Sequence, residues 1–289
     1  MRHVQCAAMQ VSEPPCTLLL DCGEGTLAAM RRTLGAAAAQ AAVDALVAIF
    51  VSHHHADHCL GLPALLQARH AHLKPLVAAL PRPVMMWLQE AHAHLLARAQ
   101  CVPCSDFTGG HFLARAGPAA TPPAAALRAA GFVAWVCPRV RHCHDAFGAV
   151  LEHRQGWKLV FSGDTMPSAQ LAELGAGATL LMHEATFGDD LAESAARKRH
   201  STVSDALEAA ERMRAWRVVL THFSQRYSKV APDAWRTGAV RSAAAAAALR
   251  RSVPAFDGMV VPFARLHSLP MLAPAMMGFV TESADEDTV

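Results

Sequence analysis

Short apolar runs alternate with segments of helical periodicity along most of the chain. A short apolar run bounded by turn residues is typical of a buried strand, whereas apolar positions recurring every three or four residues indicate a helix. We therefore expect strands at 17–20, 45–52, 76–80, 149–153, 157–161, 178–182 and 217–220. We expect helices from about Thr26 onward and over 60–71, 204–214 and 243–248. This alternation predicts an α/β fold.

Loops and turns interrupt this pattern at several places. The segment 81–138 has no clear periodicity, and Pro122 and Pro123 indicate a loop within it. Gln155–Gly156 predicts the turn of a hairpin between two of the strands. The last residues, 282–289, are polar and acidic, so we expect a disordered end to the chain.

Polar side chains follow the predicted strands, at Asp21, His53, Asp164, His183 and His222. Side chains at strand ends of an α/β sheet line the crevice where ligands bind. One histidine in such a position is usually a packing residue, but so many together are not explained by packing. The pattern therefore predicts a binding or catalytic site.

Composition excludes several classes of protein. The 289 residues are 53% hydrophobic and 17% charged, which fits a folded globular chain. No run of about 18 apolar residues predicts a membrane span, and the first residues lack the apolar run of a secretory signal. We therefore expect no membrane partner and an intracellular location, with no choice among nucleus, cytoplasm and mitochondrion. The eight cysteines include a single Cys-x-x-Cys pair, Cys101 and Cys104, and are expected to stay reduced.

The clearest chemical signal is the segment 52–58, Ser-His-His-His-Ala-Asp-His, directly after a predicted buried strand. In this His-x-His-x-Asp-His pattern, His53 and His55 can face one cation while Asp57 and His58 turn toward a second. Imidazole and carboxylate donors suit Zn²⁺. The alternative, a histidine-rich surface loop, does not explain this order and spacing after a strand.

This motif resembles that of the metallo-β-lactamase superfamily. Within the superfamily, the chain resembles ribonuclease Z, the tRNA 3′-processing endoribonuclease, from about residue 2 to residue 263. The similarity lies in the ordered motifs 140–148 (VRHCHDAFG), 162–167 (SGDTMP), 182–186 (MHEAT), 198–202 (KRHST) and 220–227 (LTHFSQRY). It implies an αββα sandwich, two mixed β-sheets flanked by helices, over residues 1–270, followed by a tail at 271–289.

The resemblance also assigns metal ligands. It implies a first zinc ion held by His53, His55 and His142. It implies a second zinc ion held by Asp57, His58 and His222, with Asp164 bridging the two. Asp21 is expected to orient a ligand imidazole from behind.

The chemistry implied is hydrolysis of a phosphodiester. Two zinc ions can share a water-derived hydroxide that attacks the phosphorus, and Asp57 can accept the water proton. His200 resembles the general acid that protonates the departing 3′-oxygen, with Glu184 holding its imidazole in the required tautomer and favouring its protonated form. The products are a 3′-hydroxyl on the tRNA and a 5′-phosphate on the trailer. Glu184 as a helix-start carboxylate is the alternative reading, and His183 is expected to be structural.

The chain departs from the ribonuclease Z pattern in two places. No glycine- and proline-rich tRNA-binding arm is recognisable between Gly61 and His142. The segment Arg2-His3-Val4 resembles only the end of the motif Pro-x-Lys-x-Arg-Asn-Val, so the amino-terminal edge is expected to be incomplete. The chain therefore resembles the carboxy-terminal half of the long form, whose amino-terminal half carries the arm.

Three functions remain open on the sequence. The leading hypothesis is a zinc-dependent endoribonuclease that removes the 3′ trailer from precursor tRNA. The second is a phosphodiesterase of the same fold acting on small or nucleotide diesters, which would need no arm. The third is a non-catalytic half serving as a scaffold, which the retained ligands disfavour. The net charge of +2 means that any nucleic-acid contact must come from a local patch.

Overall fold

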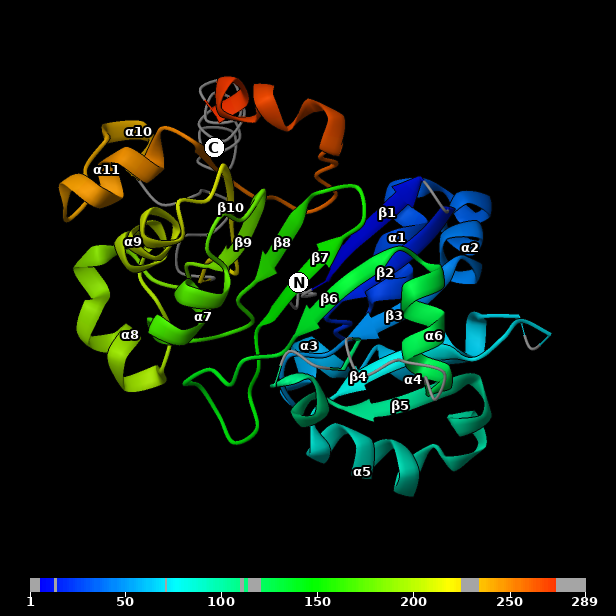
Figure 1. Cartoon of the computed structure of the whole chain (residues 1–289). Helices are drawn as coiled ribbons and strands as arrows, with labels where there is room; N and C mark the ends of the chain where they lie inside the picture. Colours follow the sequence, from blue (N-terminus) through cyan, green and yellow to red (C-terminus); the bar gives the residue numbers. More distant parts are fainter. Residues whose placement is uncertain are drawn as a thin grey trace, which may run out of the picture. The chain divides into compact units, whose positions relative to one another are not determined.

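The chain is known here from a computed structural model, which describes residues 6–12, 15–70, 72–109, 112–113, 121–224 and 234–273. It divides into two compact units. The first unit comprises Met1–Arg139 and Cys143–Trp157, and the second comprises Val140–His142 and Lys158–Val289 (Figure 1). The motif fragment 2–4, the last residues of the motif 220–227 (225–227) and the acidic end 282–289 lie outside the described residues. The boundary between a catalytic domain at 1–270 and a tail at 271–289 stays a prediction.

The first unit is built on a five-stranded mixed sheet with the strand order β1-β2-β3-β4-β5. Strands β1 and β2 are antiparallel, and β2, β3, β4 and β5 are parallel to one another. The strands are β1 Ala7–Ser12, β2 Pro15–Leu20, β3 Leu46–Phe50, β4 Leu76–Leu80 and β5 Ala99–Pro103. The predicted strands at 17–20, 45–52 and 76–80 are confirmed, β4 with its predicted bounds.

Helices in the first unit cover apolar strand side chains. The helices that follow β2 and β3 are α1 Thr26–Leu34, α2 Ala36–Asp44, α3 Ala56–Cys59 and α4 Leu62–Ala68. On α4, Leu62, Leu65 and Leu66 are fully buried, and their spacing of three and four residues places them on one helical face. Gly35 has φ +80° and separates α1 from α2, so the helix predicted from Thr26 is two helices.

The segment without clear periodicity contains regular structure. It holds α5 Arg82–Ala91, the 3₁₀ helices η1 Ala93–Arg98 and η2 Cys104–Phe107, the helix α6 Pro122–Ala129 and the strand β6 Phe132–Val136. The expectation of a loop at Pro122 and Pro123 was wrong, because both prolines occupy the first turn of α6. Proline is tolerated there since the first helical N–H groups have no intrahelical acceptor. Strand β6 pairs antiparallel with β7, Ala149–His153.

The second unit contains four parallel strands, β8 Lys158–Phe161, β9 Leu180–Glu184, β10 Arg217–Thr221 and β11 Ser252–Pro254. Its helices are α7 Ala169–Leu174, α8 Ala192–Lys198, α9 Val203–Met213, α10 Ala234–Thr237 and α11 Ala243–Leu249, with the short 3₁₀ helices η3 Asp189–Leu191 and η5 Phe263–Ser268. The predicted helices at 204–214 and 243–248 are confirmed as α9 and α11. The strand predicted at 178–182 lies two residues later, so His183 and Glu184 are strand residues.

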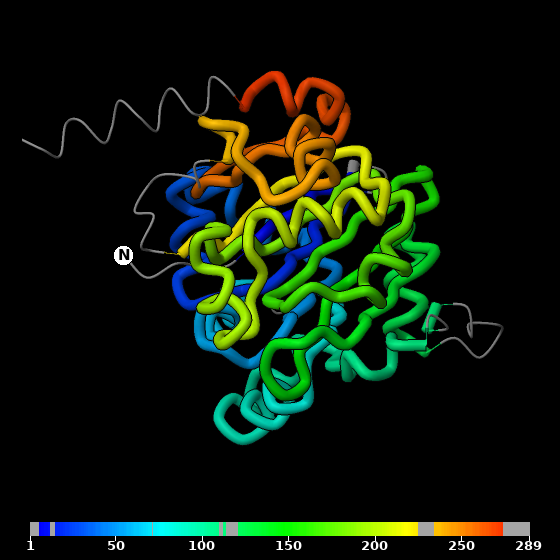
Figure 2. The backbone as a smooth tube through the Cα atoms, turned by 90° about the vertical axis from the view of Figure 1, so that its left-hand side faces the viewer, coloured from blue at the N-terminus to red at the C-terminus, as the bar shows by residue number. Residues whose placement is uncertain are grey.

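Helix α9 carries much of the second unit's core. Val203, Ala206, Leu207, Ala210 and Met213 are buried along one face of it. Thr202 and Asp205 form a capping box that satisfies backbone N–H groups at its start. The helix therefore begins directly after the motif 198–202, which fixes where that motif lies in the fold. Figure 2 shows the backbone of this unit, from the helices α8 and α9 in yellow-green to residues 263–273 in red.

Among the described residues, no helix is long and apolar enough to cross a membrane.

Candidate functional site

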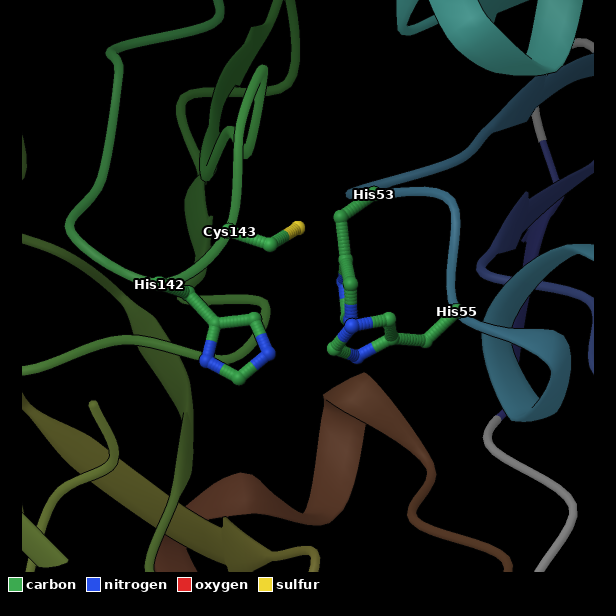
Figure 3. Close-up of side chains that lie close together, drawn as sticks. All are labelled: His53, His55, His142 and Cys143. Atoms are coloured by element: carbon green, nitrogen blue, oxygen red, sulfur yellow. The ribbon is translucent and has the colours of Figure 1, made fainter. Parts of the chain in front are cut away.

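The histidine motif covers the loop that connects β3 to α3 and the first residues of α3. His53 in the loop is fully buried, whereas in α3 His58 is 2% exposed and the side chain of Asp57 is 44% exposed. The ring centroids of His53 and His58 lie 4.1 Å apart, and those of His53 and His55 lie 4.5 Å apart. Figure 3 shows His53 and His55 side by side on the loop, with Cys143 nearby. The loop therefore presents imidazoles and a carboxylate together.

Two glycines allow this loop to lie against the turn after β2. A Cβ atom on Gly23 would lie 1.9 Å from the backbone oxygen of Asp57, and one on Gly61 would lie 2.2 Å from the backbone oxygen of Gly23. The N–H of Cys22 donates to the backbone oxygen of His58 at 2.8 Å, and the N–H of Gly61 donates to that of Cys22 at 2.8 Å. Only glycine permits backbone contact this close.

Asp21 lies behind two imidazoles of the loop. It is fully buried, and its Oδ2 accepts hydrogen bonds from Nδ1 of His58 and from Oγ of Ser52, both at 2.8 Å. Because the Ser52 hydroxyl donates to Asp21, it accepts from Nδ1 of His53, 3.0 Å away. Both imidazoles then carry their proton on Nδ1 and their lone pair on Nε2. A carboxylate that fixes the tautomer of a histidine in this way is typical of metal sites.

The second unit gathers His142, Asp164, His200 and His222. Nε2 of His222 lies 3.3 Å from Oδ2 of Asp164, and Nε2 of His142 lies 3.8 Å from the same oxygen. His142 and His200 have ring centroids 4.6 Å apart. Asp164 is 3% exposed and follows the end of β8 in the segment Ser162–Gly163–Asp164. A buried carboxylate among imidazoles is a donor set that suits a divalent cation.

His142 is held by the backbone of a distant residue. Its Nδ1 donates to the backbone oxygen of Arg199 at 2.9 Å. Burial lowers the pKa of His142, and the Arg199 carbonyl opposes that shift. The neutral imidazole is therefore favoured, with its lone pair on Nε2, the form that binds a metal ion.

Glu184 and Thr186 connect two further histidines. Nδ1 of His200 donates to Oε1 of Glu184 at 2.9 Å. The Thr186 hydroxyl donates to Oε2 of Glu184 at 2.6 Å and lies 2.7 Å from Nδ1 of His222. The backbone N–H groups of Thr165 and Thr186 also donate to Glu184, which is 2% exposed. Glu184 is therefore an acceptor within strand β9, and the reading as a helix-start carboxylate was wrong.

Several residues of the site have backbone conformations that are unfavourable for side chains with a Cβ. Asp21, Arg199 and His222 have φ of 58°, 59° and 62°. Such residues cost about 1–3 kcal/mol each and persist where the surrounding structure fixes them. In His222 this conformation turns the chain directly after β10, in Asp21 directly after β2. For Asp21 and His222 the strain therefore lies where the chain leaves a sheet, and for Arg199 it lies at the end of helix α8.

Ser52, Thr186 and Arg199 were not identified from the sequence. Each contacts a predicted site residue through a hydrogen bond whose partner cannot be found by spacing alone. Cys143 was also not identified: its Sγ and the ligand nitrogens of His53 and His55 lie within 4.8 Å of one another. Position inside a recognised motif was the one available signal for all four residues.

The residues fit a metal ion by the chemistry of their donors. In the second unit, the ligand atoms of His142, Asp164 and His200 lie within 4.8 Å of one another, as do those of Glu184, His200 and His222. Four histidines have Nδ1 within hydrogen-bond distance of a protein oxygen, which places the lone pair on Nε2. They are His53, His58, His142 and His222. Among the described residues, neither Cys101 nor Cys104 belongs to a group of possible metal ligands, and all eight cysteines are free thiols.

Comparison with known proteins gives the family. The model of the beta-lactamase superfamily domain matches residues 17–223. The chain belongs to the β-lactamase superfamily. The predicted fold class is confirmed: this superfamily member has two mixed β-sheets flanked by helices.

Relatives of this superfamily member include ribonuclease Z proteins. The chain is 36% identical to human zinc phosphodiesterase ELAC protein 2 over 99% of its length and 34% of that protein. It is 35% identical to the mitochondrial ribonuclease Z of Drosophila melanogaster over 93% of its length and 34% of that protein. A crystal structure of a long-form RNase Z from yeast has a TM-score of 0.72 at 25% identity, covering 90% of this chain and 39% of that one. The predicted resemblance is confirmed, and the chain spans about a third of the length of these curated relatives.

Proposed function

We propose that this chain is the catalytic part of a metal-dependent endoribonuclease that removes the 3′ trailer from precursor tRNA. The observation that carries the proposal is the hydrogen bond of 2.9 Å between Nδ1 of His200 and Oε1 of Glu184. These two residues belong to the motifs 182–186 and 198–202, which are part of the resemblance to ribonuclease Z. The names of the relatives support the same activity.

The proposed metal ligands are those assigned by the sequence resemblance. His53, His55 and His142 are assigned to one zinc ion, Asp57, His58 and His222 to the other, and Asp164 to both. The donor types and the placement of protons on Nδ1 support this assignment. When bound, the ions supply a water of low pKa and neutralise charge on the phosphodiester.

The chain's own residues then move two protons. Asp57 has a partly exposed carboxylate that can accept the proton of the attacking water. His200 is tied to Glu184 through Nδ1, so Nε2 is the atom that delivers a proton to the departing 3′-oxygen. The buried carboxylate of Glu184 holds the ring in this tautomer by accepting the hydrogen bond from Nδ1. These steps yield a 3′-hydroxyl on the tRNA and a 5′-phosphate on the trailer.

Recognition of the tRNA is proposed to involve a further segment. The chain spans about a third of its relatives' length, and one structural relative is described as a long form. An amino-terminal half carrying a tRNA-binding arm is the proposed partner. A precursor-tRNA substrate would place the activity inside the cell, in the nucleus, cytoplasm or mitochondrion.

A phosphodiesterase acting on small or nucleotide diesters is the second candidate. A small diester requires no tRNA-binding arm, and none is recognisable in the sequence between Gly61 and His142. The proposed chemistry at the phosphorus is the same in both candidates. Only the substrate separates them.

The test is cleavage of a precursor tRNA labelled at its 5′ end, with zinc supplied and an amino-terminal half added in a parallel reaction. We expect one product ending in a 3′-hydroxyl at the trailer junction. Hydrolysis of bis(p-nitrophenyl) phosphate without trailer removal in either reaction would favour the second candidate. Zinc binding without hydrolysis of either substrate would favour a non-catalytic half.

A further inference from the structure

His142 and Arg199 are joined by two hydrogen bonds of opposite direction. Nδ1 of His142 donates to the backbone oxygen of Arg199 at 2.9 Å. Nη1 of Arg199 donates to the backbone oxygen of His142 at 2.9 Å. The residues are 57 positions apart in the sequence, so this pair, the His142–Arg199 clasp, joins two separate motifs of the second unit.

Arg199 makes these contacts from a strained conformation. It follows the end of α8 with φ 59° and ψ 48°, and the N–H of His200 donates to the backbone oxygen of Ala195 at 2.9 Å. This arrangement is a helix-ending turn in which glycine is strongly preferred at the left-handed position. A residue with a Cβ is disfavoured there. An arginine at this position is therefore not explained by the helix end alone.

The turn has a direct effect on the candidate site. The left-handed conformation turns the Arg199 carbonyl toward Nδ1 of His142, and the next residue is His200. The guanidinium then binds the backbone of His142 from the other side. His142 is 6% exposed, and its ring centroid lies 4.6 Å from that of His200. The clasp therefore fixes both the ring and the main chain of His142 beside His200.

We propose that Arg199 is a positioning residue that holds His142 in its metal-binding orientation. The inference rests on the proposed function in one respect, that His142 is a zinc ligand. Losing an outer contact to a ligand typically weakens metal affinity by about 10–100-fold. The Arg199 carbonyl remains in any side-chain variant, so we expect a loss near the lower end, about 10-fold.

Two nearby cations contact other groups, and one of them provides a matched control. Arg197 is exposed, bonds to Ser194 and pairs with Glu193, all within α8. Lys198 lies over the ring of Phe187, with Nζ 5.6 Å from its centroid. Arg197→Ala removes the same charge from the same helix end without touching His142. It therefore separates the clasp from a general electrostatic effect of the positive charge at this helix end.

The experiment measures zinc affinity by competition with a chromogenic chelator, using the full chain and its Arg199→Gly, Arg199→Lys and Arg197→Ala variants. Thermal unfolding of each metal-free protein is measured in parallel. We expect Arg199→Gly to bind zinc about 10-fold more weakly while its unfolding temperature is unchanged or higher, because glycine relieves the strain. Arg199→Lys should retain most of the affinity, and Arg197→Ala all of it. Excess zinc should restore the activity of Arg199→Gly.

Wild-type affinity in Arg199→Gly would overturn the proposal, as would an equal loss in Arg197→Ala. A lower unfolding temperature of metal-free Arg199→Gly, with weaker zinc binding, would show a structural role instead and would also overturn it. Failure of the unmodified chain to bind zinc is a different result, because it removes the proposed function on which the inference rests.

Discussion

The hydroxyl of Thr186 donates its proton to Oε2 of Glu184 across 2.6 Å. Because a hydroxyl has one proton, Thr186 can only accept from Nδ1 of His222, which lies 2.7 Å away. Oε1 of the same carboxylate accepts from Nδ1 of His200. Glu184 therefore sets the tautomer of a proposed metal ligand through Thr186 and that of the proposed general acid directly.

Replacing the Thr186 hydroxyl should disturb the metal ligand. Thr186→Val has nearly the same shape but lacks the group that orders His222, so zinc affinity should fall by about 10–100-fold. Chelator competition measures this loss. Thr186→Ser keeps the hydroxyl and should stay close to the wild type, and a loss of the same size in both variants would contradict the role of the hydroxyl.

His200 is expected to act on the leaving group. His200→Ala should lower kcat for RNA by about 10²–10⁴-fold, the usual contribution of general acid catalysis. The loss should be much smaller for bis(p-nitrophenyl) phosphate, because nitrophenolate departs without a proton. Zinc content should remain unchanged. An equal loss on both substrates would mean that His200 positions other groups or binds metal.

Metal content should reflect the proposed ligand assignment. Elemental analysis of the purified chain should show about two zinc equivalents, since the assigned ligands form two sites. Asp164→Ala should reduce the content of both sites, and His142→Ala mainly that of one. A folded, active protein without metal would contradict the assignment.

Acid should destabilise the metal-free protein through His183. Burial lowers the pKa of this fully buried imidazole below its ordinary value. The unfolded chain therefore binds a proton below about pH 6.5 that the folded chain does not, so stability is lost as pH falls from there. Urea unfolding between pH 7.5 and pH 5 measures this loss.

The control variant is His183→Asn. It keeps a hydrogen-bond donor for the Glu184 backbone carbonyl, which lies 2.7 Å from Nδ1 of His183 in the native protein. This variant should reduce the dependence of the free energy of unfolding on pH. If the free energy of unfolding of this variant depends on pH as strongly as that of the wild type, groups other than His183 cause the loss of stability.

Substrate size should separate chemistry from recognition. Remote contacts position a large substrate and contribute to its rate, and the chain spans about a third of its relatives' length. A net charge of +2 provides few additional phosphate contacts. We expect this chain alone to hydrolyse a small diester but to process precursor tRNA weakly.

Adding an arm-bearing half should restore trailer cleavage with little change in the hydrolysis of the small diester. Robust, salt-tolerant trailer removal by the chain alone would contradict this expectation.

Strands were predictable where burial alone determines the sequence. Strand β4 is apolar at every position and fully buried, and its bounds match the prediction. The prediction was wrong at Pro122 and Pro123, because a proline in the first helical turn resembles a proline in a loop. The boundary between α1 and α2 at Gly35 was also missed, although glycine is common where a helix ends.

The candidate site could be predicted to the level of its motifs. His53 and Asp21 were identified because they follow strands, and His58 because it ends the His-x-His-x-Asp-His motif. Oδ2 of Asp21 lies 2.8 Å from Nδ1 of His58 across 37 positions of sequence. Thr186 and Arg199 could not be identified, because their roles come from hydrogen bonds to residues 36 and 57 positions away. A motif records which residue types occur together, but not which atom faces which.

The contact between Gly23 and Asp57 has a consequence for engineering. The histidine loop is fixed by backbone atoms of two crossing segments, with no Cβ between them. Its shape therefore depends little on which donors it presents. A library of variants that exchanges His55 or Asp57 for other metal-binding residues, with Gly23 and Gly61 held constant, would alter the metal preference of the site. The backbone of the loop would stay the same. In the same library built on Gly23→Ala, the loop backbone would have to shift, because the added carbon would lie 1.9 Å from the Asp57 backbone oxygen.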